Sequence, residues 1–321
     1  MKFHRPAPTR FIQTAGLTAV LCGLRLSAAE PVAASAPAEF SFVTAGDMRS
    51  YTENTKSDGK RYFDGACEAM KRVGPGAFLI SPGDFDPPAA VRTVIDQYLG
   101  PKFLWYVVVG NHEVENAAVM PWVHQWLASD IPHLVRRGVP GTQLSLYSFD
   151  GGPAHFVAID TYPFAKAGRP LNLLDLGTKG RVDLTEETFK WLDDDLAAAH
   201  QPFIFVIGHQ PLESLPDMDS GRGRHGGDSV SFDPARAARF AALLKKYHVR
   251  AYICGHTHNT SVEKVQGIWQ ADSGHARGGG DTGSPSTFLK FHLAGEKAWV
   301  EIYRADPAGR DYTVRKTVAL D

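Results

Sequence analysis

Metal-ligand side chains follow glycine at the ends of five short apolar segments of this 321-residue chain. Carboxylates, an amide oxygen and imidazoles are the donors that divalent or trivalent first-row metal ions take in proteins. The runs are Gly46-Asp47, Gly83-Asp84, Gly110-Asn111-His112-Glu113, Gly208-His209 and Gly255-His256-Thr257-His258. A single Gly-Asp is usually a turn, and a single histidine is usually a core or surface residue. Five such runs in one chain, each closing an apolar segment, indicate one shared metal site.

The elements that must position these residues are predicted strands. Their β-branched and aromatic residues and their near-continuous apolarity are typical of strands covered on both faces. The segments are Phe40–Ala45, Ala77–Ile80, Leu104–Val109, His155–Ile159, Phe203–Ile207 and Val249–Cys254. Between them, helical spacing of apolar residues predicts helices over Arg61–Val73, over Thr185–His200 and from Asp233 to about His248. Thr287–Arg304 is predicted to form two antiparallel strands. The alternation predicts an α/β domain, in which ligands bind beyond the carboxyl ends of the strands.

Composition excludes several classes of protein. Hydrophobic residues make up 43% of the chain, which is typical of a globular core and not of disorder. The formal net charge is −1, with 34 basic and 35 acidic residues, so we do not expect nucleic acid as a partner. Three cysteines are too few for a disulfide-dense scaffold or a zinc site made mainly of cysteine.

Residues 1–38 are predicted to be a signal peptide and a short linker. Lys2, Arg5 and Arg10 precede an apolar stretch, Phe11–Leu24, that is shorter than the roughly 20 residues of a membrane span. Small residues suited to cleavage follow it. An uncleaved anchor or a disordered tail is the alternative. We expect a periplasmic or secreted protein without a stable membrane anchor.

The five runs, in this order, resemble the blocks of the calcineurin-like metallophosphoesterase superfamily. The resemblance extends from about Phe40 to Arg304 and implies one catalytic domain over residues 39–321. The fold that it implies is a two-layer mixed β-sandwich flanked by helices, a four-layer αββα arrangement. It also implies two divalent or mixed-valence transition-metal ions, chosen among Mn, Fe, Zn and Ni, whose identity the sequence does not encode.

The resemblance assigns roles residue by residue. The implied metal ligands are Asp47 and His258 for the first ion, Asp84 as the bridge, and Asn111, His209 and His256 for the second ion. Asn111 is also expected to orient the cluster around Asp84. His112 would act on the phosphate and the leaving group, as an acid or as a charge stabiliser.

One position departs from the family pattern. Many members carry histidine where this chain has Arg49, and purple acid phosphatases instead carry tyrosine where it has Pro87. A guanidinium cannot ligate a metal ion, so the first site lacks one ligand. Arg49 either contacts the substrate phosphate or pairs with a nearby acid such as Glu113 or Asp84, and Asp86 is a weak candidate for the missing ligand.

The implied activity is hydrolysis of phosphate monoesters or diesters by a metal-bridging hydroxide that attacks phosphorus. Two alternatives remain: a phospho-ligand-binding protein with an incomplete first site and little turnover, and a different binuclear hydrolase. Three long loops stand out, Tyr162–Arg181, Glu213–Ser231 and His275–Pro285, and long loops in a compact domain are usually functional or disordered. Arg222 and Arg224 in the second loop would clamp an anionic substrate or remain solvated. We expect a small phosphorylated substrate, and the sequence does not predict the oligomeric state.

Overall fold

A computed structural model describes residues 39–49, 59–116, 118–139, 144–162, 184–277, 284–307, 309 and 311–321, together with Met1. The chain divides into two units, Met1–Ala36 and Pro37–Asp321. The predicted signal peptide and linker, residues 1–38, lie outside the described residues apart from Met1. All of the structure below therefore belongs to the second unit.

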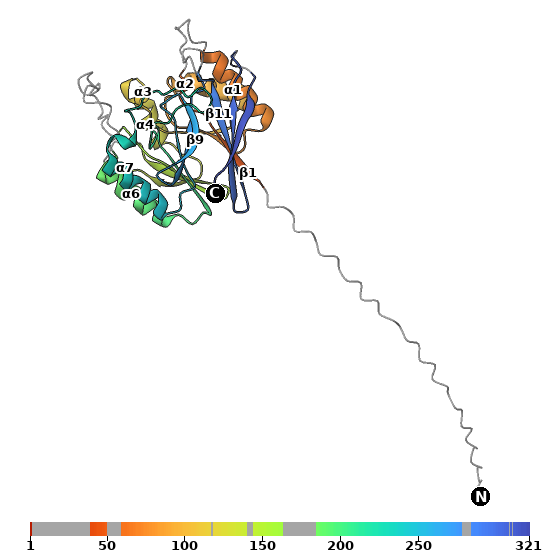
Figure 1. Ribbon diagram of the computed structural model, residues 1–321. Helices are drawn as coiled ribbons and strands as arrows, with labels where there is room; N and C mark the ends of the chain where they lie inside the picture. Colours follow the sequence, from red (N-terminus) through yellow and green to blue (C-terminus); the bar gives the residue numbers. More distant parts are fainter. Residues whose placement is uncertain are drawn as a thin grey trace, which may run out of the picture. The chain divides into compact units, whose positions relative to one another are not determined.

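Thirteen strands form two mixed sheets in the described residues (Figure 1). The six-stranded sheet has the order β13 (Thr313–Ala319), β12 (Lys297–Arg304), β11 (Thr287–Ala294), β1 (Phe40–Thr44), β2 (Phe78–Ser81), β3 (Leu104–Val107). The seven-stranded sheet has the order β4 (Leu134–Arg137), β5 (Tyr147–Gly151), β6 (Ala154–Ala158), β7 (Phe203–Ile207), β8 (Ala251–Cys254), β10 (Ile268–Ser273), β9 (Thr260–Val265). In the first sheet β1, β2 and β3 are parallel, and in the second β6, β7, β8 and β10 are parallel. Antiparallel strands complete both sheets.

Alternating side chains along the strands join the two sheets into a sandwich. Phe42 of β1 packs inward, with ring centroids 4.9 Å from Phe156 and 5.4 Å from Phe205 of the opposite sheet. The next residue, Val43, faces the helices on the outer side. On the second sheet Phe205 faces inward and Val206 faces outward. This period of two is what a strand covered on both faces requires.

Helices cover the outer faces of both sheets. Figure 1 shows α1 (Gly59–Val73) and α2 (Pro88–Leu99) beside one sheet and α6 (Glu186–Ala198) and α7 (Pro234–Lys246) on the other. The shorter helices are α3 (Asn111–Glu115), α4 (Met120–Ala128) and the 3₁₀ turn η1 (Val230–Phe232). This arrangement confirms the predicted helix-flanked sandwich. Among the described residues, no helix is long and apolar enough to cross a bilayer.

The predicted elements agree with the structure to within a few residues. Thr185 caps α6 by accepting a 3.1 Å hydrogen bond from the Thr188 backbone, and Asp233 caps α7 through the Ala235 and Arg236 backbones. β11 and β12 pair antiparallel across the predicted turn. The sequence analysis did not predict α2, α4 or the strands β4, β5 and β13. Cys67 and Cys254 are buried and free.

Candidate metal centre

The carboxyl ends of five parallel strands bring the six predicted ligands together. Asp47, Asp84 and Asn111 follow β1, β2 and β3 of one sheet, and His209, His256 and His258 follow β7 and β8 of the other. Neighbouring parallel strands end at the same edge of a sheet, so each sheet contributes one row of ligands.

The first group of ligands is buried and contains two carboxyl groups. Ligand atoms of Asp47, Asp84 and His258 all lie within 4.8 Å of one another. The His258 Nε2 atom lies 3.1 Å from Asp47 Oδ1 without forming a hydrogen bond to it, and Asp47 Oδ2 accepts the His256 backbone N–H at 2.9 Å. Burial raises the pKa of Asp47 and of Asp84 to about 7 each. Two buried carboxyl groups of this kind are stabilised in their ionised form by a bound cation, so the group fits a metal ion.

The second group presents lone pairs to a common point. His209 Nδ1 donates to the Pro82 carbonyl at 2.7 Å, which leaves Nε2 unprotonated and facing Asn111 Oδ1 at 3.2 Å. His256 Nδ1 lies 3.2 Å from the same Asn111 oxygen. The Asn111 amide nitrogen donates to Glu115 at 3.2 Å, which turns Oδ1 toward the histidines. A carbonyl that fixes the tautomer of a histidine is a usual feature of metal ligation, and these three residues also fit a metal ion.

Glu113 fastens two of the ligand runs to each other. Its buried carboxylate accepts the backbone N–H groups of Asp84 at 2.9 Å, Phe85 at 2.8 Å and Gly110 at 2.8 Å. The sequence analysis considered Glu113 only as a partner of Arg49. Its position shows that it holds the ends of β2 and β3 in register.

The glycines before the ligands make room for other ligands. A Cβ on Gly110 would lie 2.3 Å from Asp84 Oδ1, and a Cβ on Gly255 would lie 2.5 Å from Asp47 Oδ2. The backbone is left-handed at two of the ligand residues, with φ of 49° at Asp47 and 54° at Asp84, and also at Gly83, with φ of 98°. Short polar side chains tolerate this left-handed region better than most residues do.

Arg49 pairs with Asp86 and not with Glu113 or Asp84, the two acids that the sequence analysis named as examples. Its Nε and Nη2 atoms contact the two Asp86 carboxylate oxygens at 2.6 and 3.2 Å. Because both oxygens of Asp86 face the guanidinium, this geometry does not favour Asp86 as the missing ligand. The remaining Arg49 nitrogen, Nη1, lies 2.7 Å from His112 Nε2.

His112 lies between Arg49 and two carboxylates. Its Nδ1 atom is 3.3 Å from Glu115 Oε2, and its Nε2 atom is 3.6 Å from Asp84 Oδ2. Burial lowers the pKa of His112 to about 3, and the Arg49 charge contributes to the shift. A neutral imidazole at pH 7 favours the predicted role of charge stabiliser, together with Arg49, over that of proton donor.

The loop after β7 brings His225 and one of the two predicted clamp residues, Arg224, to the centre. The ring of His225 lies 4.6 Å from that of His256, and Arg224 Nε donates to His225 Nε2 at 3.0 Å. The structure thus brings Arg224 to the centre through His225. The Arg222 carbonyl accepts the Asp217 backbone N–H at 2.9 Å within the loop. The only signal in the sequence was the loop's length and glycine content.

A buried ion pair anchors this loop. Arg304 Nη2 lies 2.6 Å from Asp217 Oδ2, and the two side chains are 3% and 0% exposed. Ser284 and the Thr260 backbone donate to the same Asp217 oxygen at 2.8 and 3.1 Å. Burial alone would raise the pKa of Asp217, but the hydrogen bonds and the charge of Arg304 hold it well below its usual value.

Tyr162 is a second unpredicted residue of the centre. Its ring centroid lies 5.9 Å from that of His209 and 6.5 Å from that of His256. Its hydroxyl is buried and has no hydrogen-bond partner among the described residues. Tyr162 opens the first of the three predicted loops. The rest of that loop, and residues 278–283 of the third, lie outside the described residues.

The two-sheet fold and this donor set define a metal-dependent phosphoester hydrolase. Residues 42–260 match the sequence model of the calcineurin-like phosphoesterase family, and the chain belongs to that family. The family implies a dinuclear metal centre and an enzyme of the phosphoesterase class.

Three relatives are tartrate-resistant acid phosphatases type 5. The chain is 26% identical to the protein of Oryctolagus cuniculus in a 255-residue alignment that covers 69% of this chain and 69% of that one. It is 25% identical to the Homo sapiens protein over 63% of this chain and 61% of that one. It is 27% identical to the Mus musculus protein over 60% of this chain and 56% of that one. The matched regions thus leave about a third or more of each relative uncovered.

Solved structures share the fold at low sequence identity. A purple acid phosphatase from yellow lupin seeds superposes with a TM-score of 0.57 at 14% identity, covering 88% of this chain and 54% of that one. GAP50, the anchor in the inner membrane complex of Plasmodium, superposes with a TM-score of 0.54 at 17% identity, covering 88% and 89%. These likenesses show the fold alone.

Proposed function

We propose that this protein is an exported phosphatase or phosphodiesterase that hydrolyses small phosphate esters. The observation that carries the proposal is the convergence of six metal-ligand side chains from the ends of five strands. Two buried carboxyl groups in that cluster have pKa values raised to about 7, and the histidine Nε2 beside one of them is unprotonated. A cluster of this kind is built for cations, and a phosphate ester is the matching anionic substrate.

The ligand roles follow the two groups. Asp47 and His258 would hold the first ion, Asp84 would contact both, and Asn111, His209 and His256 would hold the second. The bound ions would supply Lewis-acid polarisation of the phosphoryl group and an acidified water.

Arg49 and His112 would receive the phosphate and the leaving group. The pairing with Asp86 fixes the guanidinium, which leaves Nη1 directed at His112. His112 is therefore held as an acceptor at Nε2 with its Nδ1 proton toward Glu115. The pair places positive charge and fixed donors beside Asp84, where negative charge on the leaving oxygen would be stabilised.

Hydrolysis assays with ligand variants test the proposal. We expect the purified protein to cleave p-nitrophenyl phosphate or its bis-ester with Mn, Fe, Ni or Zn. Asp84→Ala and His209→Ala should each lower the rate by at least about 100-fold, since loss of residues that only support metal ligands costs about 10- to 100-fold. The matched control is His200→Ala, an exposed histidine outside the centre. Full activity in both ligand variants refutes the proposal.

The position of Arg49 supports a second candidate function, which is binding of phosphorylated ligands with little turnover. Arg49 stands where many family members have a ligand, and its Asp86 partner holds it there. Elemental analysis separates the candidates when it is combined with a turnover assay. One ion per chain with tight binding of inorganic phosphate and no turnover favours the second candidate.

Export and the expected partners rest on sequence features. The basic residues and the apolar stretch of residues 1–38 support secretion to a periplasm or to the exterior. The net charge of −1 supports a small phosphorylated substrate over nucleic acid. N-terminal sequencing of the protein recovered from the periplasmic fraction tests export, and an intact Met1 in the cytoplasmic fraction contradicts it.

A further inference from the structure

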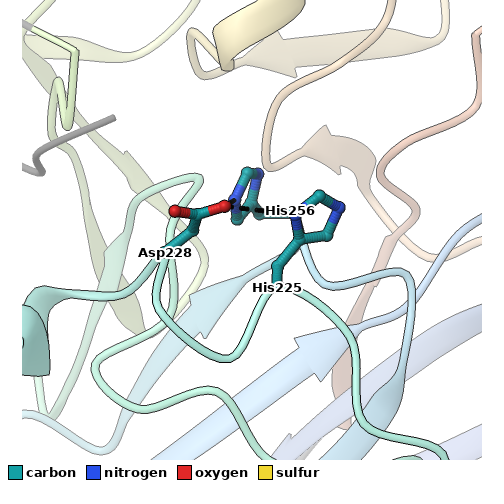
Figure 2. A group of neighbouring side chains, drawn as sticks. All are labelled: His225, Asp228 and His256. Atoms are coloured by element: carbon teal, nitrogen blue, oxygen red, sulfur yellow. Dashed lines mark hydrogen bonds and ion pairs between the residues drawn. The ribbon is translucent and has the colours of Figure 1, made fainter. Parts of the chain in front are cut away.

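The outward ring nitrogen of His256 faces a carboxylate that the strand ends do not supply. Figure 2 shows Asp228, from the loop after β7, between the imidazoles of His225 and His256. The Asp228 Oδ2 atom lies 3.2 Å from His225 Nδ1 and 3.8 Å from His256 Nε2. One atom of each of the three side chains lies within 4.8 Å of the other two. The three residues therefore form one polar cluster on the outer side of the second ligand group.

The position of one proton decides whether His256 can bind a metal ion. A neutral imidazole carries a proton on one ring nitrogen and a lone pair on the other. With the proton on Nδ1, the ring would donate to Asn111 Oδ1, 3.2 Å away, and would have no lone pair for the second ion. With the proton on Nε2, Nδ1 is free to ligate. The second ligand group therefore needs an acceptor opposite His256 Nε2.

Asp228 is placed to be that acceptor. His256 Nε2 is buried and has no hydrogen-bond partner among the described residues, in a side chain that is 8% exposed. The separation of 3.8 Å from Asp228 is longer than a hydrogen bond, and a movement of about 0.8 Å would bring the two atoms into range. The Asp228 side chain is 39% exposed, and Gly226 and Gly227 precede it. The carboxylate therefore has room to close on the ring when Nδ1 binds an ion.

Two residues of the same loop orient the Asp228 carboxylate. Arg224 Nε donates to His225 Nε2 at 3.0 Å, so the neutral His225 ring carries its proton on Nδ1. Nδ1 then donates to Asp228 Oδ2 at 3.2 Å. The His225 ring also lies against the His256 ring, with centroids 4.6 Å apart and planes at 35°. Donation thus runs from Arg224 through His225 to Asp228, which faces His256 as an acceptor.

We propose that Asp228 is a positioning residue for the second ion and acts by keeping the His256 proton on Nε2. The inference rests on the proposed function, because it uses the ligand role of His256. A carboxylate behind a ligating histidine fixes its tautomer and orientation and raises its basicity. His209 has the uncharged Pro82 carbonyl in the corresponding place. The loop after β7 thereby contributes to metal affinity without supplying a ligand.

Zinc binding to the full chain tests the inference. Zinc per chain is measured by elemental analysis after equilibrium dialysis against a series of buffered free zinc concentrations. Asp228→Ala should lower the affinity for one ion about 10- to 100-fold and change the affinity for the other much less. Asp228→Asn keeps an oxygen toward His256 and should lose less than the alanine variant. The matched control Asp130→Ala removes an exposed aspartate elsewhere and should bind zinc as the wild type does.

A double-mutant cycle shows whether Asp228 acts through His256. In the His256→Ala background, Asp228→Ala should cause no further loss of zinc affinity, because the ring that it positions is gone. Equal losses in both backgrounds overturn the inference, since Asp228 would then act independently of His256. Wild-type zinc affinity for both ions in Asp228→Ala overturns it as well.

Hydrolysis of p-nitrophenyl phosphate in the same samples keeps the two proposals apart. A chain whose zinc affinity responds to Asp228→Ala as expected, but which cleaves no ester, retains this inference and loses the proposed function. A chain that cleaves the ester with zinc, and whose zinc affinity does not respond to Asp228→Ala, retains the proposed function and loses this inference.

Discussion

Asp47→Asn should stabilise the metal-free protein at neutral pH and weaken its stabilisation by metal ions. Asp47 is fully buried, and burial raises its pKa from 3.8 to about 7. A rise of that size corresponds to about 4 kcal/mol of folding free energy. The folded-state pKa lies above the unfolded-state value, so stability is complete below pH 3.8 and is lost as the pH rises through 7. Asparagine removes the charge, keeps an acceptor for the His256 N–H and tolerates the φ of 49°.

Urea denaturation between pH 4 and pH 8 measures the effect. In chelator, the stability difference between Asp47→Asn and the wild type should grow from near zero at pH 4 to as much as about 4 kcal/mol in favour of the variant at pH 8. In excess zinc or manganese the order should reverse, because the variant loses a charged ligand. The exposed Asp130→Asn should show neither trend. A variant that is less stable than the wild type in chelator at pH 8 refutes the reasoning, since cationic side chains would then already compensate the Asp47 charge.

Three further predictions follow from groups around the centre. Tyr162→Phe should lower kcat/KM about 5- to 10-fold at unchanged metal content, because the buried hydroxyl has no partner in the described chain and a net hydrogen bond to substrate contributes about 1 kcal/mol; unchanged kinetics contradicts this. His155 is buried, which lowers its pKa, but hydrogen bonds to two aspartates outweigh that and raise it. The contribution of His155 to the free energy of unfolding is thus complete below its unfolded-state pKa of 6.5 and is lost as the pH rises through its folded-state pKa. In urea denaturation, the wild type should therefore lose stability relative to His155→Phe above about pH 6.5. Arg304→Met should cost about 3–5 kcal/mol at pH 7 by leaving Asp217 buried and unpaired. That cost should shrink as the pH falls below 3.8, because protonation removes the Asp217 charge; a constant cost down to pH 2 contradicts it.

The ligands of the centre could be predicted because each lies next to a strand in the sequence. Asp47 is two residues after Ala45 and His209 is two residues after Ile207, so a correct strand prediction already places them at the edge of a sheet. The same logic gave the helix-flanked sandwich, since near-continuous apolar strands need cover on both faces. The sequence analysis used only the position of each ligand directly after a strand. Parallel strands end at the same edge of a sheet, so the residues that follow them lie close together in space.

The unpredicted parts depend on long-range placement. The pairing of Arg49 with Asp86 joins residues 37 positions apart and depends on how two strand ends face each other. Tyr162, His225 and Asp228 lie in loops without periodicity, so no local pattern distinguishes them from solvated residues. His155 had no partner that the sequence could suggest, yet it lies between Asp150 and Asp195 at 2.7 and 3.0 Å. β4 and β13 were missed because exposed residues interrupt their apolar patterns.

The left-handed backbone at the ligands sets a limit on how this protein can be made more stable. Eight non-glycine residues have positive φ among the described residues, and four of them are the predicted ligands Asp47, Asp84, His256 and His258. Each such residue costs about 1 kcal/mol or more relative to glycine. A search that ranks substitutions by folding stability alone would therefore favour glycine at these positions and remove the metal-binding donors one at a time. Selection for catalytic turnover removes such variants. Stabilised variants of this chain that keep their activity should therefore carry their substitutions in the helices and outer strands.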